Sequence, residues 1–150
     1  MATRALGVLG ATASVPFLVR TFLATDPELK QMVQPPADYA RACAAYRLKR
    51  EIVCTLGALP CKETKEFLRE YLARDEAAAG KSAAPVFEEA TRAFLRGEVT
   101  AEELQGLLRS ANSAVRGTTI LACLDDGNAS HTSLLEKILP WTQELPRAPK

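Results

Sequence analysis

The amino-acid sequence predicts an all-α protein, and more specifically an α-solenoid of about four antiparallel helix pairs. Three observations lead to this prediction: the composition favours helices, apolar residues recur at helical spacing, and one apolar motif occurs twice. Aromatic residues make up only 6% of the chain, while Ala and Leu are abundant. Strands prefer aromatic and β-branched side chains, whereas Ala and Leu are strong helix formers.

Length and charge narrow the possibilities further. A chain of 150 residues, 47% of them hydrophobic and 25% charged, has the composition of an ordinary folded domain. The formal net charge of +1 provides no bulk attraction to nucleic acid or to an anionic membrane. No stretch reaches the roughly 18 apolar residues of a membrane span. We expect one domain over residues 1–141 and a loose tail over 142–150.

The first elements are two short helices, over residues 3–11 and 13–24. In the second helix, Val15, Leu18 and Phe22 recur at helical spacing and are expected to lie on one side. A proline-rich connector follows, in which one turn over residues 28–33 is predicted.

Two longer segments form the middle of the chain. A helix is predicted over residues 37–59, and Pro60 stops it. A shorter helix over 63–73 has its apolar residues on one stripe. These are Phe67, Leu68, Tyr71 and Leu72. Four charged residues of the long helix are expected to be exposed to solvent, namely Arg47, Lys49, Arg50 and Glu51.

The second half of the chain contains the clearest helix signals, after a small and polar loop over 75–84. One helix is predicted over 85–97. Thr100 and Glu103 form a capping box for the next, which runs to residue 110. Asn112 or Ser113 is expected to cap the following helix, which carries Val115, Ile120, Leu121 and Leu124. After a turn at 125–129, a last helix over 130–139 ends at Pro140.

An internal repeat supports stacked helix pairs. At an offset of 50 residues, the motif at residues 6–18 matches the one at 56–68, and both read Leu-Gly-x-Leu, seven residues, Phe-Leu. A looser copy joins Leu121 and Leu124 to Leu134 and Leu135. One helix pair cannot bury both of its faces, so neighbouring pairs must stack.

The first copy resembles the HEAT-repeat signature. Its residues 4–10 read Arg-Ala-Leu-Gly-Val-Leu-Gly, and residues 14–18 read Ser-Val-Pro-Phe-Leu. The resemblance implies a HEAT-like superhelix of helix pairs over 3–24, 37–73, 85–110 and 113–140, with the second helix of each pair on the concave face. A compact, irregular helical bundle is the alternative architecture.

The sequence contains no catalytic, metal or cofactor motif that we recognise. Its only histidine, His131, lies among hydroxyl residues at a helix start. Residues 79–82 resemble the end of a phosphate-binding loop but have no upstream glycine and no preceding strand. The acidic pair at 125–126 is typical of a turn. No two cysteines form a CxxC pair, and Cys43 and Cys54 are expected to be buried thiols in a helix.

The function that we expect is therefore non-catalytic protein binding by a scaffold or adaptor. The candidate partner-binding residues lie on the polar side of the helix over 63–73 and at its start, and they are Lys62, Lys65, Glu66, Arg69 and Glu70. Arg69 is the strongest single candidate, since arginines are favoured interface anchors.

Two alternatives stay open. The first is nucleic-acid binding by a basic stripe on the helix over 37–59, in which Tyr39 and Tyr46 alternate with Arg41, Arg47, Lys49 and Arg50. The second follows from the HEAT-like resemblance, because lyases and DNA glycosylases occur in that group. We expect a reducing, cytoplasmic location, although the apolar start with no acidic residue before Asp26 leaves a secretion signal or an organelle address open.

Overall fold

The computed structural model describes residues 5, 7, 9–25, 35–74 and 85–125. These residues form helices and contain no strand, which confirms the all-α prediction for this part of the chain. In chain order, the elements are the 3-10 helix η1 (Thr12–Ser14) and the α-helices α2 (Val15–Ala24), α3 (Pro35–Gly57), α4 (Lys62–Leu72), α6 (Phe87–Leu95), α7 (Ala101–Leu108) and α8 (Ser113–Asp125).

Several predicted segments fall outside the described residues. They are residues 3, 4, 6 and 8 of the helix over 3–11, the turn over 28–33, the loop over 75–84, and everything after residue 125, including His131, the helix over 130–139 and the tail. The limits predicted for the domain therefore remain predictions. No helix within the described residues is both long enough and apolar enough to cross a membrane.

Local signals explain where the described helices begin and end. Helix α3 starts at Pro35, two residues earlier than predicted, because proline suits the first turn of a helix, where its missing N–H is not needed. The capping box of α7 is confirmed: the Thr100 hydroxyl accepts a hydrogen bond from Glu103 N–H, and the Glu103 carboxylate accepts one from Thr100 N–H. Asn112 caps α8 by accepting from the N–H of Ala114.

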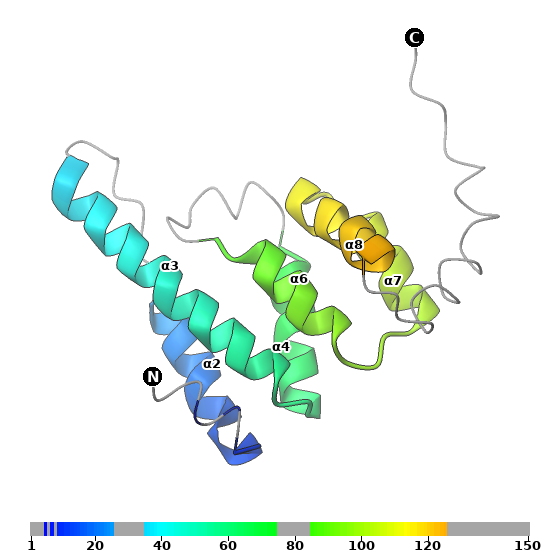
Figure 1. Cartoon of the computed structure of the whole chain (residues 1–150), viewed down its shortest axis with the longest axis horizontal. Coiled ribbons are helices and arrows are strands. Elements are labelled where there is room, and N and C mark those ends of the chain that lie inside the picture. The colour runs from blue at the N-terminus through cyan, green and yellow to red at the C-terminus, as the bar shows by residue number, and fades with distance from the viewer. Residues whose placement is uncertain (1–4, 6, 8, 26–34, 75–84, 126–150) are drawn as a thin grey trace, which may run out of the picture.

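The helices lie in two rows (Figure 1). Helix α6 packs between α3 and α8 in the first row, and in the second row α2 contacts α4, while α7 is joined to α4 by side chains. Between the rows, α2 packs on α3, α4 on α6, and α7 on α8. The sequence predicts that α3 pairs with α4 and α6 with α7, and the structure differs. Instead, α6 packs most extensively on α3, α4 and α8.

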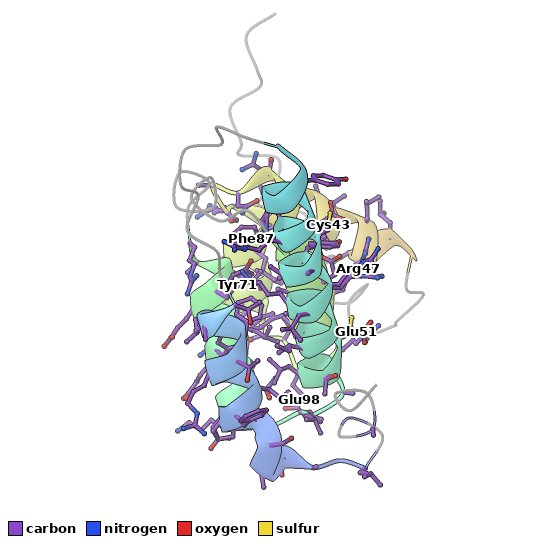
Figure 2. The ribbon with its side chains drawn as sticks, turned by 90° about the vertical axis from the view of Figure 1, so that its left-hand side faces the viewer. Cys43, Arg47, Glu51, Tyr71, Phe87 and Glu98 are labelled. Carbon is purple, nitrogen blue, oxygen red and sulfur yellow. The ribbon has the colours of Figure 1, made fainter. Side chains whose placement is uncertain are left out.

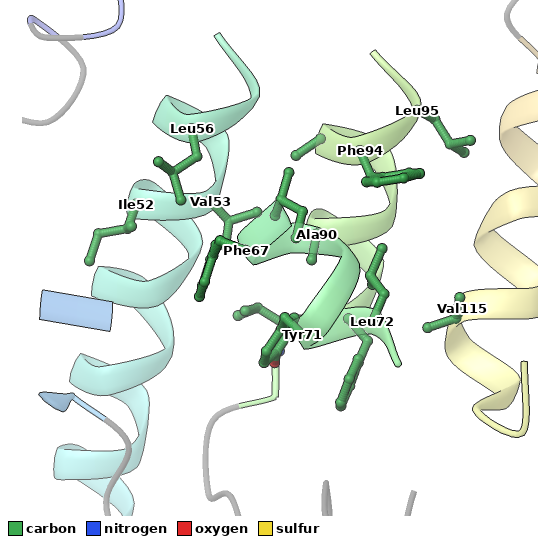
Figure 3. Close-up of a cluster of buried hydrophobic side chains, with 14 of the residues drawn as sticks. Ile52, Val53, Leu56, Phe67, Tyr71, Leu72, Ala90, Phe94, Leu95 and Val115 are labelled. Atoms are coloured by element: carbon green, nitrogen blue, oxygen red, sulfur yellow. The ribbon is translucent and has the colours of Figure 1, made fainter. Parts of the chain in front are cut away.

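An aromatic cluster joins α2 to α4 within the second row and α4 to α6 between the rows. Phe22 of α2 meets Phe67 and Tyr71 of α4 edge to face, with ring centroids 5.2 Å and 5.1 Å apart. Tyr71 stacks on Phe87 of α6 at 4.8 Å, and its hydroxyl accepts a hydrogen bond from the N–H of Val86. The apolar stripe predicted for α4 is thus confirmed. The same core includes buried side chains of α3, α6 and α8, which Figure 3 shows beside those of α4.

The structure corrects the predicted exposure of several side chains. Lys49, expected to be exposed to solvent, has no exposed surface, because it lies on the buried face of α3 between α2 and α4. Cys54, expected to be buried, is exposed because it lies on the opposite side of the same helix, and Cys43 is only half-buried. On α8, Val115 is buried, but its other three predicted apolar residues, Ile120, Leu121 and Leu124, are exposed.

The close approach of α3 and α6 gives a first prediction. A Cβ added at Gly57 would lie 3.0 Å from the Cβ of Ala93 and 3.1 Å from its Cα, so the α6 backbone would have to move. We expect Gly57→Ala to lower the free energy of unfolding by about 1–3 kcal/mol. In α8, Gly117 has no atom within 4 Å of a built Cβ, so Gly117→Ala should stabilise the helix. Urea unfolding of both variants measures these changes. If Gly117→Ala lowers the free energy of unfolding as much as Gly57→Ala does, the prediction is wrong.

Candidate functional site

The five predicted partner-binding residues form one polar face of α4, which we call the α4 face. It comprises Lys62, Lys65, Glu66, Arg69 and Glu70. The opposite side of α4 is the buried stripe of the aromatic cluster, so the helical period alone turns these residues outward. Lys62 forms an ion pair with Glu66 one turn later, at 3.7 Å. Lys65 is the most enclosed of the five, and the others are exposed.

Two of these residues are tied to the neighbouring helix. The guanidinium of Arg69 donates a hydrogen bond to Oε1 of Glu103 in α7, and Lys65 Nζ lies 3.0 Å from Oε2 of the same carboxylate. Lys65 also donates to the main-chain oxygen of Glu98 at 2.8 Å. We call Lys65, Arg69 and Glu103 the Glu103 bridge. It links α4 to α7 while it leaves 53% of the Arg69 side chain exposed.

The bridge changes the acid–base behaviour of Glu103. Partial burial of this carboxyl on its own raises the pKa, but the hydrogen bond from Thr100 N–H and the interactions with Arg69 and Lys65 lower it more strongly. The net result is a pKa of about 2, against the usual value of 4.5. The ionised form is therefore the one that the fold stabilises.

A pH dependence follows from this shift. Because the folded-state pKa of Glu103 lies below its unfolded value, its stabilising effect is complete above about pH 4.5 and is lost as the pH falls towards 2. We expect Glu103→Gln to destabilise the protein by about 1 kcal/mol at pH 6 and by much less at pH 2. Denaturation midpoints measured at both pH values would check this. Glu102→Gln, at an exposed position of the same turn, is the matched control. The prediction is wrong if the stability difference between wild type and Glu103→Gln is the same at both pH values.

Two cavities lie on either side of the bridge. The first, of about 410 Å³, is bounded by the ends of α3 and α6 and the start of α4, and it includes Leu56, Pro60, Leu68 and Phe94. The second, of about 320 Å³, lies between the end of α4 and α7, and it includes Leu72, Gly106 and Leu107 together with the same Phe94. Apolar side chains line both cavities, and cationic side chains lie at both.

The basic stripe predicted for nucleic acid does not form one surface. Lys49 points into the core, and Arg50 lies 3.5 Å from Glu89 of α6. The Tyr46 hydroxyl donates a hydrogen bond to the same carboxylate at 2.6 Å. Figure 2 shows Arg47 with Cys43 and Glu51 along an edge of α3, on the side away from Tyr71 and Phe87. The helical rotation between successive residues separates the cations of this stripe.

Within the described residues, no group of three or more histidine, cysteine or acidic side chains could hold a metal ion. All four cysteines are free thiols. The other segments considered above for chemistry, at residues 79–82 and at His131, lie outside the part of the chain that the structure describes.

The sequence did not identify several residues that complete this region. Glu103 was recognised as a helix cap, but its contact with Arg69 spans 34 residues and has no local signal. Phe94 and Arg74 likewise have no local sequence signal for this site, because only the packing of α6 and α4 brings them to the cavities.

Comparison with protein-family models, with curated proteins and with solved structures found no match to this chain.

Proposed function

We propose that this protein is a non-catalytic protein-interaction module with an HEAT-like α-solenoid architecture. The observation that carries the proposal is the surface along α4, from the ends of α3 and α6 to α7, which we call the seam. Here exposed charges of the α4 face adjoin two apolar cavities. Protein interfaces commonly combine an apolar centre with a charged rim and arginine anchors. The two rows of helices support a solenoid, because stacked helix pairs also form two layers.

The α4 face suits a binding role because its side chains are only partly committed within the chain. Glu66 is paired with Lys62, and this ion pair is largely exposed, so it contributes little to stability. Arg69 contacts Glu103 through Nη2 and keeps about half of its side chain in solvent. A partner can therefore meet these charges without first breaking the core.

The proposal is tested by affinity capture from the native host with three versions of the full chain. They are the wild type, an α4-face variant (Lys62→Glu with Arg69→Ala), and a control variant on α3 (Arg41→Glu with Arg47→Ala). We expect a protein that co-purifies with the wild type and the control in constant ratio and is lost from the α4-face variant.

Circular dichroism and thermal unfolding must show that both variants keep the fold, since a misfolded chain loses partners for trivial reasons. Capture of the same proteins by the α4-face variant would exclude this surface. The absence of any stoichiometric partner for the wild type would count against an interaction module as a whole.

A further inference from the structure

We propose that the seam along α4 binds a short acidic peptide segment that carries bulky apolar side chains. This proposal rests on the proposed function and adds to it the chemistry of the partner. The surface in question consists of the two cavities and the Glu103 bridge between them.

The charges at this seam favour an anionic partner. Four side chains that line the two cavities are cationic, namely Lys62, Lys65, Arg69 and Arg74, and two are acidic, namely Glu98 and Glu103. Glu103 is already held by Lys65 and Arg69, so its charge is compensated within the chain. Lys62 is paired with Glu66, which lies outside the cavities, so the lining itself has two more cationic than acidic side chains. The guanidinium of Arg69 is half exposed, and its planar group has further donors to offer to a carboxylate.

The walls of the cavities require apolar groups as well as charge. Leu68 and Phe94 line the first cavity, and Leu72, Phe94 and Leu107 line the second. Each cavity can take a large apolar side chain, and burial of such a side chain supplies about 1.5–3 kcal/mol. A nucleic acid would satisfy the cations through its phosphates but would leave these walls unfilled, so the lining favours a peptide.

The size of the seam agrees with a peptide rather than a small molecule. The lining residues run from Pro60 to Arg74, along the whole of α4. A helix of this length is about 16 Å long, at 1.5 Å per residue. A ligand that fills both cavities must cross the bridge between them. A helical segment of a few turns, or an extended segment of a few residues, does so while its acidic groups face Arg69 and Lys62.

The test uses three fluorescein-labelled peptides and fluorescence polarisation with the full chain. The first peptide has leucines at helical spacing on a background of Glu and Ala. The second replaces each Glu by Lys, and the third replaces each Leu by Ser. We expect the first peptide to bind and the other two to bind about tenfold more weakly or not at all, with the affinity of the first falling as salt rises.

Two variants locate the binding site, each with a matched control. Arg69→Ala removes the central cation, and Arg47→Ala removes an exposed arginine from α3. Gly106→Leu fills the second cavity, because Gly106 lines it and a Cβ there meets no atom within 4 Å. Gly117→Leu adds the same side chain on α8, where the space is equally open. Arg69→Ala and Gly106→Leu should each weaken binding about tenfold, and the two controls should leave it unchanged.

Other outcomes would overturn the inference. Equal binding of the acidic peptide to Gly106→Leu and to the wild type would place the site elsewhere. Binding of the lysine peptide, or of a single-stranded oligonucleotide in place of the acidic peptide, would exclude the proposed partner chemistry. If no peptide binds while affinity capture still depends on the α4 face, the acidic-peptide inference fails and the proposed function stands.

Discussion

Replacing Phe22 by alanine is expected to lower the free energy of unfolding by about 3–5 kcal/mol. Phe22 is 1% exposed, and it is the largest of the three α2 side chains that belong to the core, beside Val15 and Leu18. Its ring meets the rings of Phe67 and Tyr71 edge to face, with interplanar angles of 78° and 85°. The substitution removes these contacts and leaves a cavity between α2 and α4 that helices anchored on both sides cannot close.

The same helix offers a matched control. Phe17 belongs to α2 as well, but 60% of it is exposed. Phe17→Ala should therefore change the free energy of unfolding by no more than about 0.5 kcal/mol. Urea or guanidinium unfolding followed by circular dichroism measures both variants. Equal losses for the two phenylalanines would show that α2 does not pack on α4 through Phe22.

The sequence predicted the features that depend on neighbouring residues. The buried side of α4 and the capping box of α7 were both recognised, because a helical period and a hydrogen-bonded first turn leave signals within a few positions. The outward direction of Lys65 and Arg69 follows from the same period. These features set the helices and their faces, but they do not say which faces meet.

The internal repeat shows where such reasoning fails. Leu9 and Leu59 occupy matching positions of the motif, yet Leu9 is 78% exposed and Leu59 is fully buried. Phe17 and Phe67 differ in the same way, although both precede a buried leucine. Helices α2 and α6 cover α4 from two sides, whereas α2 lies at the edge of the described helices. Two copies of the same apolar motif therefore acquire different environments from contacts that are remote in the chain.

The candidate site combines both kinds of information. Its cations could be assigned to one face from the sequence, but the carboxylate that joins them comes from another helix. The cavities depend on Phe94, which α6 brings beneath the seam by packing on α4. The region that could bind a partner is thus a product of helix stacking rather than of any single segment.

Lys49 is the residue for which the position expected from its charge differs most from the observed one. Its charge indicated an exposed position, but it is spaced along α3 with Ala45, Ile52, Val53 and Leu56, all of which are buried. Lys49 Nζ lies 4.5 Å from the centre of the Phe22 ring and 6.0 Å from that of Tyr71. A lysine can cover apolar surface with its aliphatic stem, and its ammonium group is attracted to aromatic faces.

Lys49→Ala is therefore expected to destabilise the fold by about 2–4 kcal/mol, since it removes both a buried stem and a cation over aromatic rings. Lys49→Met keeps most of the stem without the charge, and its stability should fall between those of wild type and Lys49→Ala. Lys62→Ala, at an exposed position of the α4 face, is the control and should stay within about 0.5 kcal/mol of wild type. If Lys49→Met unfolds as easily as Lys49→Ala, the cation contributes most of the stabilisation; if Lys49→Ala matches the control, Lys49 does not lie in the core.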